Sequence, residues 1–240
     1  SGHLLGGAMA AIVLGPWAAM LVMTAVVAVQ ALLFQDGGLL VMGANILDMG
    51  LVTAAIGYGL YRAVAGQSKT VKLAVAGVAA WLSVMAGALL TALQLWLSGT
   101  SQLGIVIPAM LGVHALIGLG EALITVAALS FILQTRPDLL GDGSESAKGG
   151  RGWVVTGGII ALAVVLLSPL ASADPDGLER VATDMGFINA GQSAPYSIIP
   201  DYTLPFLGET AISTIMAGVI GVIVVGAVIV LIGRGMKAKA

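Results

Sequence analysis

The chain consists of long apolar stretches separated by short polar segments. Several of these stretches reach or exceed the roughly 20 residues that an α-helix needs to cross a hydrocarbon core. The pattern predicts a short Gly/Ala-rich segment and six further spans, at about 4–15, 17–34, 44–62, 72–97, 108–134, 153–171 and 210–233. We therefore expect an all-α membrane protein, a polytopic transmembrane helical bundle of about six to seven membrane segments.

The composition agrees with a bilayer as the solvent of this chain. Charged residues make up 9% and hydrophobic residues 58% of it, against roughly 25% and 45–50% in ordinary soluble domains. The formal net charge of −2 argues against a nucleic-acid partner. Because the chain has no cysteine, thiolate metal sites and disulfides are excluded, and only nitrogen and oxygen donors remain for ligand chemistry.

The basic residues predict how the spans are oriented. Nine of the ten lysines and arginines lie in three segments: Arg62, Lys69 and Lys72; Arg136, Lys148 and Arg151; and Arg234, Lys237 and Lys239. Alternation of the spans brings these three segments to one side, which the positive-inside rule identifies as cytoplasmic. The C-terminus is then cytoplasmic, and the first short segment runs inward, so we expect Ser1 to His3 at the outer face.

A polar segment divides the chain into a front and a rear part. Residues 141–152, with a Gly-Asp-Gly-Ser-Glu-Ser run, are predicted to be a flexible cytoplasmic linker. It separates a front domain, 1–140, from a two-span rear module, 153–240. The two rear spans are joined by a proline-containing outer loop, 172–208, which we interpret as a small exposed loop or cap.

Polar side chains inside the spans are candidates for function, because a charge at the bilayer centre costs about 2.5–3.5 kcal/mol on insertion scales. With the predicted orientation, the following polar residues are expected in the outer third: His3, Gln30, Asn45, Asp48, Gln94 and His114. This distribution favours capture of a small polar ligand from outside. The alternative is that such groups simply occupy helix ends, where Asn45 caps the next helix and amides meet headgroup water.

Glu121 lies near the middle of its predicted span, seven residues after His114 and on nearly the same face. It could orient a histidine ring, act as a proton-linked gate, or be a protonated acid bonded to a neighbour such as Gln94. A neutral packed carboxylic acid is the competing interpretation. An intramembrane enzyme using His114 and Glu121 as an acid/base pair is disfavoured, because no nucleophile or second carboxylate is suitably placed.

The chain contains no G-x-x-x-x-G-K-[ST] phosphate-binding loop, so it is not expected to hydrolyse ATP. Partner subunits are then the better source of energy for any active uptake, because the spans contain few carboxylates that could move ions. We expect a transport component rather than an enzyme, without a tightly bound cofactor.

Several strings together resemble one family, the CbiM/NikM substrate-specific components of energy-coupling-factor transporters. In the front part they are Ser1-Gly-His-Leu-Leu-Gly-Gly-Ala8, Leu14-Gly-Pro-Trp17, Val29-Gln-Ala-Leu-Leu-Phe34, Asp36-Gly-Gly38, Gly43-Ala-Asn45, Gly57-Tyr-Gly59 and Gly112-Val-His-Ala-Leu-Ile-Gly-Leu-Gly-Glu-Ala122. In the rear part, Pro175-Asp-Gly-Leu-Glu179 and Pro200-Asp-Tyr-Thr-Leu-Pro205 resemble the PDGLE extension, which is similar to the companion CbiN-type module.

The resemblance implies a membrane component that binds Co²⁺ or Ni²⁺ at its outer side. It further implies partners, namely a transmembrane coupling protein and cytoplasmic ATPases, in the plasma membrane of a bacterium or archaeon. In the family, nitrogen donors hold the ion: the terminal amine and histidine of a Met-His start, and a histidine that corresponds to His3. Nitrogen ligation suits late first-row ions. The front part departs from the family pattern, since no Met-His start is present, and we expect a fragment that lacks the leading segment. The alternative function is a membrane assembly or regulatory subunit that does not itself bind metal.

Overall fold

The computed structural model describes residues 4–140, 152–171, 174–191 and 194–237, and this part of the chain contains helices and loops but no strand. His3 and most of the predicted linker, including Lys148 and Arg151, lie outside the described residues. Contacts divide the chain into two compact units. Unit 1 comprises Ser1–Met23, Gly43–Ala147 and Asp174–Gln192, and unit 2 comprises Thr24–Met42, Lys148–Ala173 and Ser193–Ala240.

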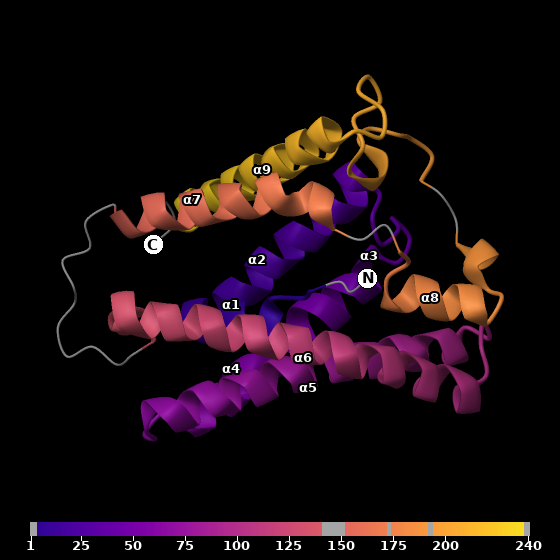
Figure 1. The fold of residues 1–240 in the computed structure, drawn as a ribbon. Helices are drawn as coiled ribbons and strands as arrows, with labels where there is room; N and C mark the ends of the chain where they lie inside the picture. The colour runs from indigo at the N-terminus through magenta and orange to yellow at the C-terminus, as the bar shows by residue number, and fades with distance from the viewer. Residues whose placement is uncertain (1–3, 141–151, 172–173, 192–193, 238–240) are drawn as a thin grey trace. The chain divides into compact units, whose positions relative to one another are not determined.

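The helices confirm the predicted all-α membrane architecture (Figure 1). Unit 1 contains α1 (Gly7–Leu14), the start of α2 (Pro16–Val29), α3 (Met42–Asn45), η2 (Ile46–Val52), α4 (Thr53–Ala63), α5 (Lys69–Leu97), α6 (Leu103–Thr135), η3 (Pro137–Leu140), α8 (Gly177–Asp184) and η5 (Ile188–Ala190). Unit 2 contains the rest of α2, η1 (Gln30–Phe34), α7 (Gly152–Leu167), η4 (Ser168–Leu170), η6 (Pro200–Tyr202) and α9 (Ala211–Lys237).

Among the described residues, four helical stretches are long and apolar enough to cross a membrane: Pro16–Phe34, Lys69–Leu97, Leu103–Thr135 and Ala211–Gly235. Val155–Leu170 is a shorter apolar helix. The predicted span 44–62 corresponds to the consecutive α3, η2 and α4, in which the seven-residue π-helix η2 interrupts the α-helical hydrogen bonding. The chain is therefore a multi-pass membrane protein.

The first segment is shorter than the sequence pattern predicted. Helix α1 has 8 residues, which at 1.5 Å per residue is about 12 Å and less than half of a hydrocarbon core. Gly6 (φ 70°) precedes the helix and Gly15 (φ 80°) follows it, and both have a positive φ, which favours glycine. The segment predicted at 4–15 is therefore helical only over Gly7–Leu14, and α1 by itself is too short to span the membrane.

Helix α6 begins earlier than predicted, at Leu103 after the N-cap Gln102, with Pro108 inside the helix. Pro108 lies in the second turn, where it removes the one intrahelical bond that its nitrogen would donate to the Gly104 carbonyl. The predicted start at 108 is therefore wrong. His114 lies about three turns into the helix.

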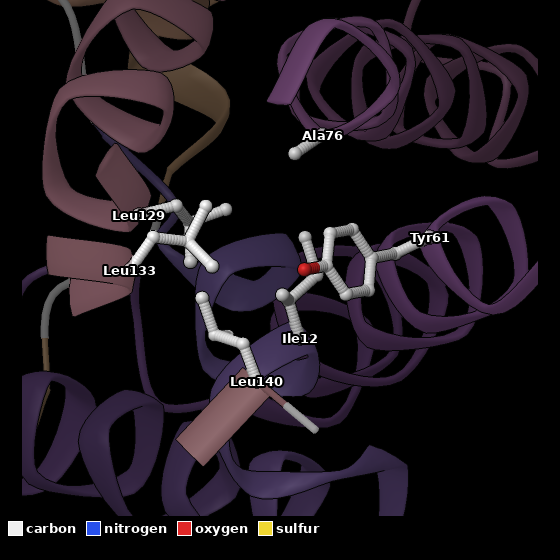
Figure 2. Packing of buried hydrophobic residues seen from close by; sticks show 6 residues of the cluster. All are labelled: Ile12, Tyr61, Ala76, Leu129, Leu133 and Leu140. Carbon is white, nitrogen blue, oxygen red and sulfur yellow. The ribbon is translucent and has the colours of Figure 1, made fainter. Parts of the chain in front are cut away.

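One end of unit 1 has an apolar core formed by α1, α4, α5, α6 and η3. Figure 2 shows its side chains converging between the helices, namely Ile12, Tyr61, Ala76, Leu129, Leu133 and Leu140. Arg62 lies in the last turn of α4, next to Tyr61. Lys69 begins α5, and Arg136 directly follows α6. Three of the predicted cytoplasmic basic residues therefore share this end of unit 1. Arg136 donates to Asp138 at 2.8 and 2.7 Å, and these bonds lower the pKa of the Asp138 carboxyl.

The outer loop predicted at 172–208 contributes to both units. Residues 174–191 belong to unit 1, whereas the segment from residue 194 onward packs in unit 2 against the end of α2 and η1. There the rings of Phe34 and Tyr202 stack with centroids 4.5 Å apart. The Tyr196 hydroxyl donates to the Leu32 carbonyl at 2.9 Å. The loop is therefore held in place by specific contacts.

Candidate functional site

The buried carboxylate of Glu121 holds the backbone that leads into α1. Glu121 lies near the middle of the 33-residue helix α6 and is 4% exposed. Its Oε2 accepts the N–H of Leu5 at 3.0 Å, and its Oε1 accepts the N–H of Gly6 at 2.7 Å. The segment that directly follows His3 is thus fixed at the depth of the middle of α6. The hypothesis of a Glu121–Gln94 bond is wrong, because the Gln94 amide donates to another carboxylate.

That other carboxylate is Asp48, in the π-helix η2. Asp48 is 3% exposed, and it accepts the Thr91 hydroxyl at 3.1 Å and the Gln94 amide at 3.0 Å. Its backbone carbonyl and the Leu5 side chain both lie against Gly87, where an added Cβ would be 3.5 and 3.8 Å from them. The helix-end interpretation is wrong for Asp48, because Asp48 is buried inside a hydrogen-bond network that adjoins the Leu5 side chain, and the partly buried Gln94 is one of its donors.

Asn45 and Gln30 have different surroundings from those predicted. Asn45 is inside the helical run that begins at Met42, with φ −61° and ψ −38°, and its side chain makes no capping bond. The capping interpretation is wrong because the helix starts one turn earlier. Gln30 opens the π-helix η1 in unit 2, and its side chain is hydrogen bonded to Tyr202.

The Tyr202 hydroxyl also donates to Asp36 at 2.7 Å. Burial, with the nearby Asp36 carboxylate as a second cause, raises the pKa of the Tyr202 phenol. This network lies within unit 2, so Gln30 belongs to a different compact unit from Asn45, His114 and Glu121.

His114 is half-buried two turns before Glu121 on α6. Its Nδ1 lies 2.8 Å from the Met110 carbonyl oxygen, so Nδ1 bears the proton of this bond and Nε2 is the unprotonated nitrogen of the neutral ring. Gly177 covers the opposite edge of the imidazole, since a Cβ added there would lie 2.6 Å from Cε1 and 2.8 Å from Nε2. His114 is therefore a packing partner of α8.

Helix α8 contains the last three residues of the PDGLE string, Gly177 to Glu179, in its first turn and is stabilised by a capping box. The Asp176 carboxylate accepts the Glu179 N–H at 2.9 Å, and the Glu179 carboxylate accepts the Asp176 N–H at 3.1 Å. Val181 then packs into a cluster with Ala88, Ala92, Val106 and Met110 of α5 and α6. The PDGLE string thus forms a docked helix at the end of unit 1 opposite the basic residues.

We expect Gly177→Val to displace α8, because the isopropyl group would occupy the space of the His114 ring. Hydrogen–deuterium exchange of residues 177–184 should become at least about tenfold faster, since loss of docking exposes these amides to local opening. Leu178→Ala is the control, because the Leu178 side chain is 37% exposed and its truncation leaves the glycine contact intact. Equal exchange in Gly177→Val and the unmodified protein would contradict the packing argument.

Among the described residues, no group of three or more histidine, cysteine, aspartate or glutamate side chains is placed to hold a metal ion. The carboxylates of Asp48 and Glu121 and the His114 ring are each bound to a separate partner instead. His3, the predicted ligand, lies outside the described residues. Sequence reasoning missed that Thr91 and Gln94 bind Asp48; their i,i+3 spacing on one helix, with an aspartate in a neighbouring span, is a signal that could have indicated it.

Comparison with known proteins matches residues 1–139 to CbiM, described as a cobalt uptake substrate-specific transmembrane region, and residues 151–238 to the PDGLE domain. NikMN of Archaeoglobus fulgidus is 33% identical over 94% of this chain and 75% of its own length. The fused nickel transport protein NikMN of Rhodobacter capsulatus is 27% identical over 98% of this chain and 78% of its own length.

A crystal structure of a truncated transition metal transporter shares 33% identity and a TM-score of 0.52, covering 56% of this chain and 69% of that one. In two other relatives, the region that matches this chain covers 64% and 53% of the relative's own length.

Proposed function

This chain belongs to the CbiM family of substrate-specific transmembrane regions and has a PDGLE extension, and on this basis we propose that it is the substrate-capture component of an ATP-driven energy-coupling-factor importer for cobalt or nickel ions. The front domain, 1–140, receives the ion, and the rear module, 153–240, is the accessory part. A transmembrane coupling protein and cytoplasmic ATPases supply the energy, and the assembly lies in the plasma membrane of a bacterium or archaeon. The ion is transported substrate.

The observation that supports this proposal most is the fixed position of the segment next to His3. Glu121 binds the N–H groups of Leu5 and Gly6, so the backbone that follows the proposed ligand in sequence is held inside unit 1. The Leu5 side chain also adjoins the Asp48 network at Gly87.

The donor chemistry is consistent with the proposed ions. Residues 1–6 contain neither cysteine nor methionine, so the histidine nitrogen is the softest donor among them, and imidazole suits nickel and other late first-row ions. Buried carboxylates near a cationic substrate would favour its entry, because opposite charges attract more strongly in a medium of low dielectric constant. Asp48 and Glu121 supply such groups within unit 1.

Uptake of radioactive Ni²⁺ or Co²⁺ tests the transport function. Cells that express the full-length protein with its coupling protein and ATPases are expected to accumulate one of the ions, and inactivation of the ATPases should abolish accumulation. Accumulation that persists without the ATPases would contradict ATP-driven transport. The absence of uptake of either ion by the complete assembly would contradict the transport function itself.

The docking of α8 on unit 1 favours a second candidate, an assembly or regulatory subunit that leaves metal binding to another chain. Deletion of residues 141–240 separates the two candidates. If the second is correct, uptake collapses, whereas metal affinity of the remaining complex is unchanged and is insensitive to His3→Ala. If the first is correct, His3→Ala abolishes metal binding by this chain.

A further inference from the structure

We propose that Asp48 is a proton-binding site in unit 1 and that Thr91 is the group that changes with its charge. In the proton-bound state, the neutral acid donates from Oδ2 to the Thr91 hydroxyl oxygen, and the Thr91 hydroxyl donates to the Gly87 carbonyl. When the O–H bond of the acid breaks and the proton leaves to solvent water, the Thr91 hydrogen turns from the carbonyl to the carboxylate.

The hydrogen bonds around Thr91 support the neutral acid. The Thr91 hydroxyl oxygen lies 3.1 Å from Asp48 Oδ2 and 3.0 Å from the Gly87 carbonyl oxygen. A hydroxyl has one hydrogen to donate and can also accept, whereas a carbonyl oxygen can only accept. Both contacts are therefore full hydrogen bonds at the same time only if Asp48 supplies the second hydrogen.

The distances to Asp48 also differ from those of a charged acceptor. A hydroxyl that donates to a carboxylate usually lies about 2.5–2.7 Å from it, which is shorter than the 3.1 Å between Thr91 and Asp48. The Gln94 amide donates to Asp48 Oδ1 at 3.0 Å, the ordinary length of an N–H···O bond between neutral groups. Neither donor approaches Asp48 as closely as a buried negative charge would draw it.

No basic side chain in the described part of the chain forms an ion pair with Asp48, which is 3% exposed. An unpaired buried carboxyl usually takes up a proton, because the charged form is costly in an apolar environment. Helix α1, which packs against η2, has no charged side chain. The titratable or charged side chains of the other two packed helices, α4 and α5, are Tyr58, Tyr61, Arg62, Lys69 and Lys72. Arg62 is about four turns from Asp48 along the chain, and Lys72 is about five turns from Thr91.

Glu121, the other buried carboxyl among the described residues of unit 1, has different partners. Its two oxygens face the backbone N–H groups of Leu5 and Gly6, which donate and cannot accept. These bonds favour the charged form, and a proton on Glu121 would have no acceptor among its recorded partners. We therefore expect the two buried carboxyls to differ in charge, with Glu121 ionised and Asp48 neutral.

Loss of the proton would present a negative charge to an arriving ion. A cation near Asp48 favours the ionised form, because an opposite charge stabilises a carboxylate. This step rests on the proposed function, and the carboxylate that attracts the ion there is the proton-free state of Asp48. The proton-binding site itself is tested without any metal, so its failure and the failure of the proposed function are separate results.

Infrared spectroscopy of the full-length, metal-free protein in detergent at neutral pH tests the site. A protonated carboxylic acid has a C=O stretching band above the amide I band, and a carboxylate lacks it. We expect this band in the unmodified protein, its reversible loss as the pH is raised, and its absence in Asp48→Asn. Glu121→Gln is the matched control, because it changes the other buried carboxyl and should leave the band in place.

Two Thr91 variants decide the matter if Asp48→Asn does not fold. Thr91→Val removes the oxygen that accepts from the acid, so the band should move to higher frequency or disappear. Thr91→Ser keeps the hydroxyl and should leave the band unchanged. The proposal is overturned if the unmodified protein lacks the band, if neither Asp48→Asn nor Thr91→Val alters it, or if Glu121→Gln removes it while Asp48→Asn retains it.

Discussion

Gly57→Val is expected to lower the free energy of unfolding of unit 1 by about 3 kcal/mol, at the upper end of the range for overpacked cores. A Cβ added at Gly57 would lie 2.5 Å from Cα, 2.8 Å from Cβ and 2.9 Å from the carbonyl oxygen of Ala8. Because two of these three atoms belong to the backbone of α1, no side-chain rotation can relieve the clash, and the two helices must separate. Thermal or denaturant-induced unfolding of the purified protein in detergent measures the loss.

Gly59→Val is the matched control on the same helix. Nothing lies within 4 Å of a Cβ added at Gly59, so we expect its stability to stay within about 0.5 kcal/mol of the unmodified protein, as is usual for substitutions away from packed contacts. Comparable losses in the two variants would show that valine acts through helix propensity, and the close approach of α1 to α4 would then be contradicted.

The second large effect is expected at Asp48. Asp48→Leu removes the acceptor of the Gln94 amide, and leaving such a donor unsatisfied costs about 1–3 kcal/mol. The Thr91 hydroxyl keeps the Gly87 carbonyl at 3.0 Å as an acceptor, so we expect a loss of about 2 kcal/mol in the free energy of unfolding, from the Gln94 donor alone. Asp48→Asn retains one acceptor oxygen and should lose less.

A double-mutant cycle isolates the Asp48–Gln94 interaction. Replacing both partners by leucine removes the donor together with its acceptor, so Asp48→Leu/Gln94→Leu should be more stable than the sum of the two single losses by at least about 1 kcal/mol. The same denaturation measurement applies to all three variants. Strict additivity would contradict the buried hydrogen bond.

Hydropathy predicted the long helices well, because a membrane-spanning helix must be apolar over most of its length and satisfy its own backbone hydrogen bonds. It failed at α1, where the run 4–15 is apolar throughout. There Gly6 and Gly15, which both have a positive φ, flank the helix and limit it to Gly7–Leu14. It also failed at the start of α6, because Pro108 is tolerated inside the helix. Hydropathy does not report backbone conformation, which set the bounds of α1 and the start of α6.

The candidate site was predicted only in part. The rarity of carboxylates in apolar spans indicated Glu121 as functional, but its partners are backbone N–H groups more than 100 residues away, and no spacing rule predicts such a contact. Likewise, the string that contains His114 and the string that contains Gly177 were recognised separately, whereas their contact depends on how α8 packs. The hydrophobic periodicity of a sequence does not predict tertiary contacts of this kind.

Titration of the full-length protein with Ni²⁺ and Co²⁺ tests the central proposal, that this chain itself captures the ion and that His3 is a ligand. We predict saturable binding of at least one ion, and we predict that His3→Ala weakens it by about 100-fold or more, since loss of a direct ligand should exceed the 10- to 100-fold effect of an orienting group. Binding of neither ion, or binding that His3→Ala leaves unchanged, would contradict the account.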